Sequence, residues 1–160
     1  MRPWRASLST SATDLWDSIA DGAGRESPLW AAAARDDLDR QPVFSLLCDG
    51  VYALGLETIY EGYLCHYGRP RLFAPADAEL GLLLGDYLYA HGLVRIAATG
   101  SVSAVAELAE LISICSRLHA EGENGDGEAW LAAAVALGPR PPADDAVERA
   151  LAAHRGRVAR

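Results

Sequence analysis

Apolar residues recur about every three or four positions along most of this chain, which is the spacing that places them on one face of an α-helix. Segments that alternate strictly between apolar and polar residues are missing, and so are β-branched clusters bounded by turn residues. At 160 residues the chain is long enough for one domain with its own hydrophobic core. The sequence therefore predicts a single all-α domain over residues 1–160, folded as a helical bundle.

Glycine, proline and helix-capping residues divide this bundle into segments. We expect an N-terminal arm with a short helix over residues 1–26, core helices over 27–121, and a C-terminal helix, which can be peripheral, over 139–160. The polar, glycine-rich stretch 121–127 is expected to be a surface loop. Gly50, Gly55 and Gly62 lie within the stretch 42–68 and weigh against one straight helix there.

Several helix starts are marked by capping residues. Ser27, followed by Pro28 at the first helical position, predicts the start of a helix that continues to Leu38. Ser101 can cap a later helix in the same way. Residues 80–98 are apolar on nearly all sides, which is typical of a central or interface helix.

The composition limits the classes of partner. The net charge is −8 and the isoelectric point is near 4.9, which disfavours nucleic acid because binding phosphates requires clustered cations. No apolar run approaches the roughly 20 residues that span a bilayer, so no membrane span is expected. The N-terminus lacks the apolar core of a signal peptide, so a cytoplasmic location is expected.

Cys48, Cys65 and Cys115 lie far apart in apolar surroundings and are expected to be buried and reduced.

A turn containing Gly68 and Pro70 precedes an apolar helix with the sequence Leu84-Gly85-Asp86-Tyr87-Leu88-Tyr89-Ala90. This combination resembles the N-terminal half of the trans-polyprenyl diphosphate synthases, over roughly residues 42–123. The resemblance implies a helical bundle like the N-terminal half of the isoprenoid synthase fold. It implies structural roles for Gly68, Pro70, Gly85 and Asp86. Because an acid inside an apolar helix needs donors, Asp86 is expected to be buried and paired with an arginine or backbone amides.

In that family an Asp-Asp-x-x-Asp motif binds magnesium ions that hold a diphosphate, and an Arg-Arg pair follows. The matching positions here are Glu57, Thr58 and Glu61 for the aspartates, and His66 and Tyr67 for the arginines. Two carboxylates one helical turn apart could form a weak cation site, but a solvated helix edge is the simpler interpretation. We therefore expect no catalytic, metal or substrate-binding residue in this chain, and Mg²⁺ only in a catalytic partner.

The resemblance implies a non-catalytic small subunit of a heteromeric bacterial polyprenyl diphosphate synthase. Such a subunit pairs with a full-length catalytic subunit, as a heterodimer or heterotetramer, and influences its stability or product chain length. The expected interface consists of apolar positions on two helices: Leu80, Leu83, Leu84, Tyr87, His91, Leu108, Leu111, Ile112 and Cys115.

Two alternatives to this subunit stay open. One is a homodimeric helical interaction protein without an isoprenoid role. The other is a minimal class I terpenoid synthase that uses Glu57, Glu61 and Asp86 to bind metal.

Overall fold

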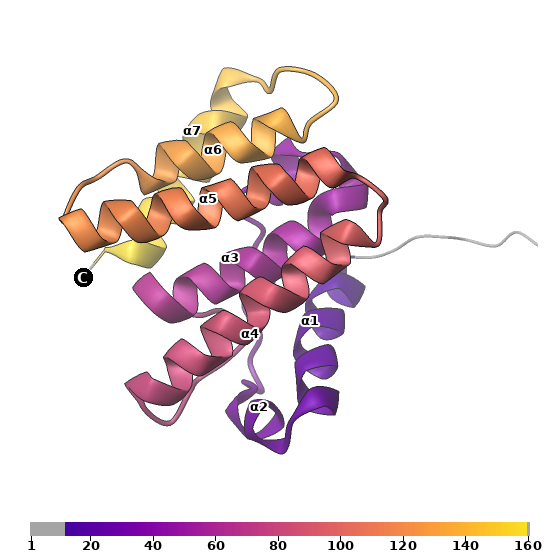
Figure 1. The fold of residues 1–160 in the computed structure, drawn as a ribbon, viewed down its shortest axis with the longest axis vertical. Coiled ribbons are helices and arrows are strands. Elements are labelled where there is room, and N and C mark those ends of the chain that lie inside the picture. The colour runs from indigo at the N-terminus through magenta and orange to yellow at the C-terminus, as the bar shows by residue number, and fades with distance from the viewer. Residues whose placement is uncertain (1–11, 160) are drawn as a thin grey trace, which may run out of the picture.

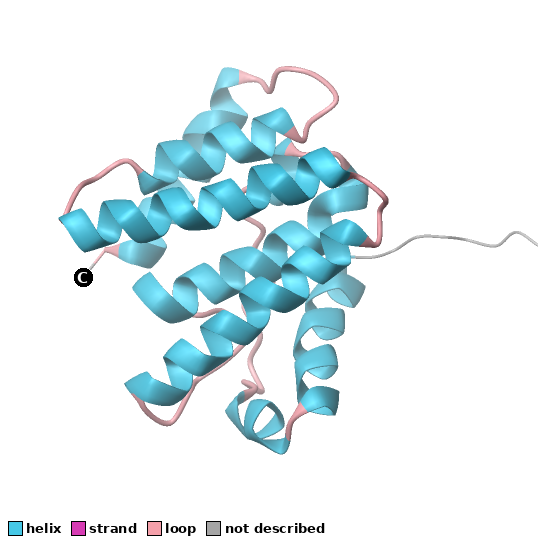
Figure 2. Cartoon of the chain, viewed as in Figure 1, coloured by secondary structure: helices cyan, strands magenta, loops and turns pink. Residues whose placement is uncertain are grey.

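The computed structural model describes residues 12–159, and the side chains of residues 15–159. Within that range the chain is all-α, without a β-strand, which confirms the predicted fold class (Figure 2). The helices are α1 (Ala12–Glu26), α2 (Pro28–Ala33), the short 3-10 helices η1 (Ser45–Leu47) and η2 (Gly50–Tyr52), α3 (Ala53–Tyr67), α4 (Ala78–Ala97), α5 (Val102–Glu121), α6 (Asp126–Ala136) and α7 (Asp144–Val158). Residues 1–11 of the expected N-terminal arm lie outside the described residues. Between residues 12 and 159 no helix combines the length and the apolar character that a membrane crossing needs.

Helices α3 and α4 lie side by side through the middle of the bundle (Figure 1). Helices α5, α6 and α7 pack on one side of this pair, and α1 and α2 pack on the other. The buried residues form two clusters. One surrounds Tyr60 and Trp130, between α3 and the α5–α7 layer, and the other surrounds Trp16 and Leu88, next to α1 and α2.

Glycines allow α3 and α4 to approach each other closely. A Cβ atom on Gly62 would lie 2.9 Å from the carbonyl oxygen of Gly85, and one on Gly92 would lie 3.1 Å from that of Gly55. In each helix the two glycines are two turns apart, so they share one face. The glycines at 55 and 62 therefore do not interrupt α3, which is continuous from Ala53. The irregular part of the 42–68 stretch is instead its beginning, where the chain forms η1 and η2.

Replacing Gly62 with alanine is expected to lower the free energy of unfolding by about 1–3 kcal/mol, because a backbone atom of α4 occupies the space and cannot move independently. The matched control is Gly156→Ala, since Gly156 also lies in a helix but has no atom within 4 Å of the added Cβ. That change should stabilise the protein by up to about 1 kcal/mol through helix propensity. Urea denaturation measures both, and a stabilising effect at Gly62 would contradict close α3–α4 packing there.

Two helices begin where their capping residues predict, whereas α2 does not end where the apolar spacing predicts. Ser27 Oγ accepts a hydrogen bond from the Leu29 amide, and Ser101 Oγ accepts one from the Ala104 amide. Helix α2 ends at Ala33, although the sequence predicted a helix to Leu38. The reason is tertiary, because the chain after α2 pairs with residues 72–74. The Arg35 amide donates to the Leu72 carbonyl at 2.9 Å, and the Ala74 amide donates to the Ala33 carbonyl at 2.7 Å.

The three cysteines are free. Cys48 and Cys115 are buried, and burial raises the pKa of each thiol to about 12. Cys65 is half-buried, and burial also raises the pKa of its thiol. All three thiols are therefore protonated and unreactive at neutral pH.

Helix α7 begins and ends within the predicted C-terminal segment, but it is more than peripheral. Its Ala150 and His154 are buried against the bundle. The His154 ring lies among Phe44, Tyr60 and Tyr63, with ring centroids 5.5–5.9 Å apart.

Candidate functional site

Glu57 and Glu61 lie one turn apart on α3, at the positions that match the acidic motif, and both are completely buried. Their exposed fractions are 1% and 0%. The expectation of a solvated helix edge is therefore wrong. The stretch of α3 that carries them, residues 55–64, is covered on all sides by the rest of the bundle.

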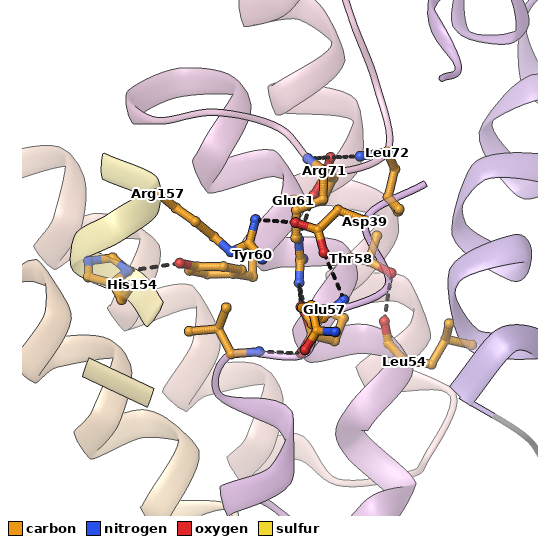
Figure 3. Close-up of polar contacts among 12 residues, drawn as sticks. Asp39, Leu54, Glu57, Thr58, Tyr60, Glu61, Arg71, Leu72, His154 and Arg157 are labelled. Carbon is orange, nitrogen blue, oxygen red and sulfur yellow. Dashed lines mark hydrogen bonds and ion pairs between the residues drawn. The ribbon is translucent and has the colours of Figure 1, made fainter. Parts of the chain in front are cut away.

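Arg71 supplies the positive charge that makes this burial possible. It follows the Gly68–Pro70 turn, and its side chain extends between the two carboxylates (Figure 3). Arg71 Nη1 donates to Glu57 Oε2 at 2.7 Å, and Arg71 Nε donates to Glu61 Oε2 at 3.1 Å. Arg71 Nη1 also donates to the Gln41 carbonyl at 3.0 Å. The acidic pair is thus an internal ion-pair site.

The remaining carboxylate oxygens accept hydrogen bonds from backbone amides. Glu61 Oε1 accepts from the amides of Arg71 at 2.8 Å and Leu72 at 2.7 Å. Glu57 Oε1 accepts from the Val43 amide at 3.4 Å. A magnesium ion needs free oxygen ligands and room for water or phosphate, so these residues do not fit one. In the part of the chain that the structure describes, no cluster of three or more His, Cys, Asp or Glu side chains is placed to hold a metal ion.

Two aromatic rings complete the surroundings of Arg71. Its guanidinium carbon lies 4.7 Å from the centroid of the Trp16 ring and 5.0 Å from that of Tyr60, which are cation–π distances. Burial works against the charged form, but the Glu57 and Glu61 carboxylates raise the pKa of Arg71 above its ordinary value. Arg71 therefore carries its charge at any working pH.

Thr58, the third position of the acidic motif, is also buried and has a packing role. Its hydroxyl donates to the Leu54 carbonyl at 2.6 Å and accepts from Arg95 Nη1 at 2.7 Å. Arg95 Nη2 donates to the carbonyl of Ser18. Thr58 thus helps to connect α3 with α4 and α1.

A second polar centre surrounds Asp126, in the first turn of α6. Asp126 Oδ2 accepts a hydrogen bond from the Tyr63 hydroxyl and lies 3.2 Å from His154 Nε2 and 3.5 Å from His119 Nε2. These three partners come from α3, α7 and α5. The hydrogen bond from His154, followed by that from Tyr63, holds the pKa of Asp126 well below its ordinary value, although burial opposes this. The carboxylate therefore connects four helices in its ionised form.

The polar chain continues from His154 into the core. His154 Nδ1 lies 2.9 Å from the hydroxyl of Tyr60, which is buried (Figure 3). Because an ionised Asp126 can only accept, the Nε2–H group of His154 donates to it, and Nδ1 faces the Tyr60 hydroxyl. Burial raises the pKa of the Tyr60 hydroxyl, which keeps it a donor.

His66 and Tyr67, at the positions that match the arginine pair, line a surface cleft of about 390 Å³. His119, Arg69 and Arg157 line it as well, and the Tyr67 and His119 rings stack with centroids 3.8 Å apart. Both arginines already have partners within the chain. Arg157 Nη1 lies 2.9 Å from Asp39 Oδ2, and Arg69 donates to carbonyls at the end of α7.

Carboxylates also face the two histidines of this cleft. His66 Nε2 lies 3.1 Å from Asp86 Oδ1, and His119 Nε2 lies 3.5 Å from Asp126 Oδ2. These acids offset the positive charge that a diphosphate would require. The cleft has the imidazole groups that acid–base chemistry uses, but it lacks a surplus of cations.

Asp86 does not occupy the expected place. Its side chain is 72% exposed, and its partner is His66 instead of an arginine. The neighbouring Gly85 faces α3, and one residue further along a helix points about 100° away. The expectation of a buried, arginine-paired acid is therefore wrong.

The expected interface divides into buried and accessible residues. Leu84, Leu108, Leu111 and Cys115 are buried in the core of this chain, so their assignment to an intermolecular contact is wrong. Leu83 is exposed, while Leu80, Tyr87, His91 and Ile112 are half-buried. The helices turn their broadest apolar sides toward each other within the chain, so little of the predicted surface is left for a partner.

Sequence reasoning missed Arg71, Asp126 and His154. The signal for Arg71 was the acidic pair itself, because two acids in an otherwise apolar helix need a nearby positive charge if they are buried. Asp126 lies in the stretch that was predicted to be a surface loop, yet it begins α6. No local pattern connects it with His154, since 28 residues separate the two.

Protein-family models, curated proteins and solved structures were all compared with this chain, and none of the three comparisons gives a match.

Proposed function

We propose that this chain is a non-catalytic helical subunit that pairs with a full-length polyprenyl diphosphate synthase and influences its stability or product chain length. The proposal includes a bacterial, heteromeric enzyme located in the cytoplasm, with Mg²⁺ held by the catalytic partner. It is based on the resemblance of residues 42–123 to that family, and two structural observations support it.

The observation that carries the proposal is an exposed apolar surface on α4. Leu83 is 54% exposed and Val94 is 62% exposed, and neighbouring Leu82 is also exposed. Leu83, Tyr87 and Val94 are spaced by one and two helical turns, so they share a face. We call Leu82, Leu83, Tyr87 and Val94 the outer face of α4. Leu82, Leu83 and Val94 are exposed and Tyr87 is half-buried, and exposed apolar side chains grouped on one helix are typical of a site of protein association.

The second observation concerns chemistry. The Glu57 and Glu61 carboxylates are occupied by Arg71 and by backbone amides, so they are not free to bind the metal on which prenyl transfer depends. This weighs against the terpenoid synthase alternative and favours a subunit without its own chemistry. The homodimer alternative would use the same outer face of α4, so experiment must separate the two.

The test is co-expression with a full-length polyprenyl diphosphate synthase from the same source. We expect the two chains to copurify as a stoichiometric complex whose product length differs from that of the synthase alone. The isolated chain should show no turnover of an allylic diphosphate with isopentenyl diphosphate and Mg²⁺. Turnover by the pure chain, or self-association without binding to the synthase, would contradict the proposal.

Substituting Leu83 with glutamate tests the surface itself. The change places a charge in the middle of the contact, so we expect binding to the synthase to weaken by about tenfold or more. Leu46→Glu is the matched control, because Leu46 is also an exposed leucine but lies in η1, away from α4. Calorimetric titration with the synthase measures both variants. Equal weakening by the two substitutions, or none by either, would place the contact elsewhere.

A further inference from the structure

The loop between α5 and α6 contains the only asparagine of this chain, Asn124, and a glycine follows it. The loop covers residues 122–125 and lies at one end of the bundle (Figure 1). The Asn124 side chain is exposed, and Gly125 is half-buried. An asparagine that precedes glycine can react with its own backbone, because glycine has no side chain to shield its amide nitrogen or to restrict the approach of the two groups.

The backbone of this loop leaves both reacting groups free. The Glu123 amide donates to the Leu118 carbonyl at 2.8 Å, and the Gly125 carbonyl accepts from the Ala129 amide at 3.0 Å. In contrast, neither the Asn124 side chain nor the Gly125 amide takes part in a hydrogen bond with any residue between 12 and 159. Gly125 also has a φ of +120°, a conformation that favours glycine. The fold therefore requires glycine at the position where glycine makes the reaction easiest.

We propose that Asn124 is a site of spontaneous deamidation through a cyclic imide with Gly125, and that the isoaspartate formed there displaces Asp126. The Gly125 amide nitrogen attacks Asn124 Cγ and loses its proton. The new N–Cγ bond forms while the bond from Cγ to Nδ2 breaks, and Nδ2 leaves with that proton as ammonia. Water then opens the imide. Opening at Cγ gives aspartate, and opening at the main-chain carbonyl carbon gives isoaspartate.

The two products differ in what they do to the start of α6. In isoaspartate the main chain runs through the side-chain carbons, so it is longer by one carbon atom directly before Gly125. Asp126 follows at once, and its Oδ2 accepts from the Tyr63 hydroxyl and lies 3.2 Å from His154 Nε2. Hydrogen bonds weaken steeply outside a narrow range of distance and angle. Isoaspartate therefore disturbs these contacts, whereas aspartate changes the charge of the loop without changing its length.

Incubating the folded chain at mildly alkaline pH tests the reaction. Because the chain has a single asparagine, deamidation raises its mass in one step, and peptide mapping locates the change and separates aspartate from isoaspartate. The matched control is Asn124→Gln, which keeps an amide but would have to close a larger ring. We expect the wild type to gain mass several-fold faster than this control. Equal rates in the two proteins, or a gain that maps to Gln41, would overturn the proposal.

Thermal unfolding of the aged protein tests the effect on Asp126. We expect the melting temperature to fall as the isoaspartate fraction grows, whereas freshly prepared Asn124→Asp, which has the normal linkage, should melt like the wild type. Asn124→Gln aged in parallel corrects for slow changes at the aspartate–glycine pairs of the chain. A loss in Asn124→Asp as large as that in the aged wild type, or no loss in either, would overturn the displacement of Asp126.

The Asp126→Ala background shows whether the loss passes through this carboxylate. Because that variant already lacks the contacts to Tyr63 and His154, the same isoaspartate fraction should lower its melting temperature less than it does in the wild type. An equal decrease in both backgrounds would show that isoaspartate acts elsewhere, contrary to the proposal. The reaction needs neither a partner nor a metal, so its outcome leaves the proposed subunit function to its own test.

Discussion

Replacing Arg71 with methionine is expected to lower the free energy of unfolding by about 3–5 kcal/mol, because it leaves two buried carboxylates without their positive charge. Arg71 is fully buried, and it contacts both Glu57 and Glu61. Methionine fills similar space and keeps the contact with the Trp16 ring, so the loss reports mainly the charge. Urea denaturation at neutral pH measures the effect.

Two further variants separate charge from packing at this site. Arg149→Met is the matched control, since Arg149 also pairs with an acid, Asp145, but its side chain is 71% exposed. It should change the stability by less than about 1 kcal/mol. Adding Glu57→Gln and Glu61→Gln to Arg71→Met should recover part of the loss, because neutral amides do not require a counter-charge. If Arg71→Met destabilises no more than the control, the ion-pair site contributes little.

Replacing Asp126 with alanine is expected to cost about 1–3 kcal/mol for each buried donor that loses its acceptor. The affected donors are the Tyr63 hydroxyl and the Nε2–H group of His154. Asp126→Asn keeps one acceptor oxygen and should cost less. Asp144→Ala, at an exposed acid in the first turn of α7, is the control and should have little effect.

The effect of Asp126 should also depend on pH in a defined direction. The pKa of its carboxyl is lowered in the folded state from an ordinary value of 3.8, chiefly by the hydrogen bond from His154. The contribution of the ionised carboxylate to the free energy of unfolding is therefore complete above about pH 5, and it is lost progressively as the pH falls below about 4. The stability difference between wild type and Asp126→Ala should narrow as the pH falls below about 4. A difference that widens in acid would show that Asp126 is not held in its ionised form.

The sequence by itself determined the all-α class and the ends of several helices, because both depend on local chemistry. Ser27 and Ser101 cap helices as their side chains predict, and α7 begins at Asp144, directly after the proline-rich linker. Capping and proline restrictions act within a few residues, so a single sequence contains the information. The resemblance to a prenyl synthase and the function inferred from it stay predictions.

Only the tertiary structure decided which charged residues are buried and which partners they have. Glu57 and Glu61 would be solvated on an isolated α3, and they are buried because the turn after Pro70 brings Arg71 between them. Asp86 lies at the surface. The sequence could not show this, because a helix that is apolar on nearly all sides does not specify which side faces the core. Asp126 and His154 meet only when α6 and α7 pack together. Electrostatic pairing in a folded chain depends on distances in space, which local sequence patterns do not contain.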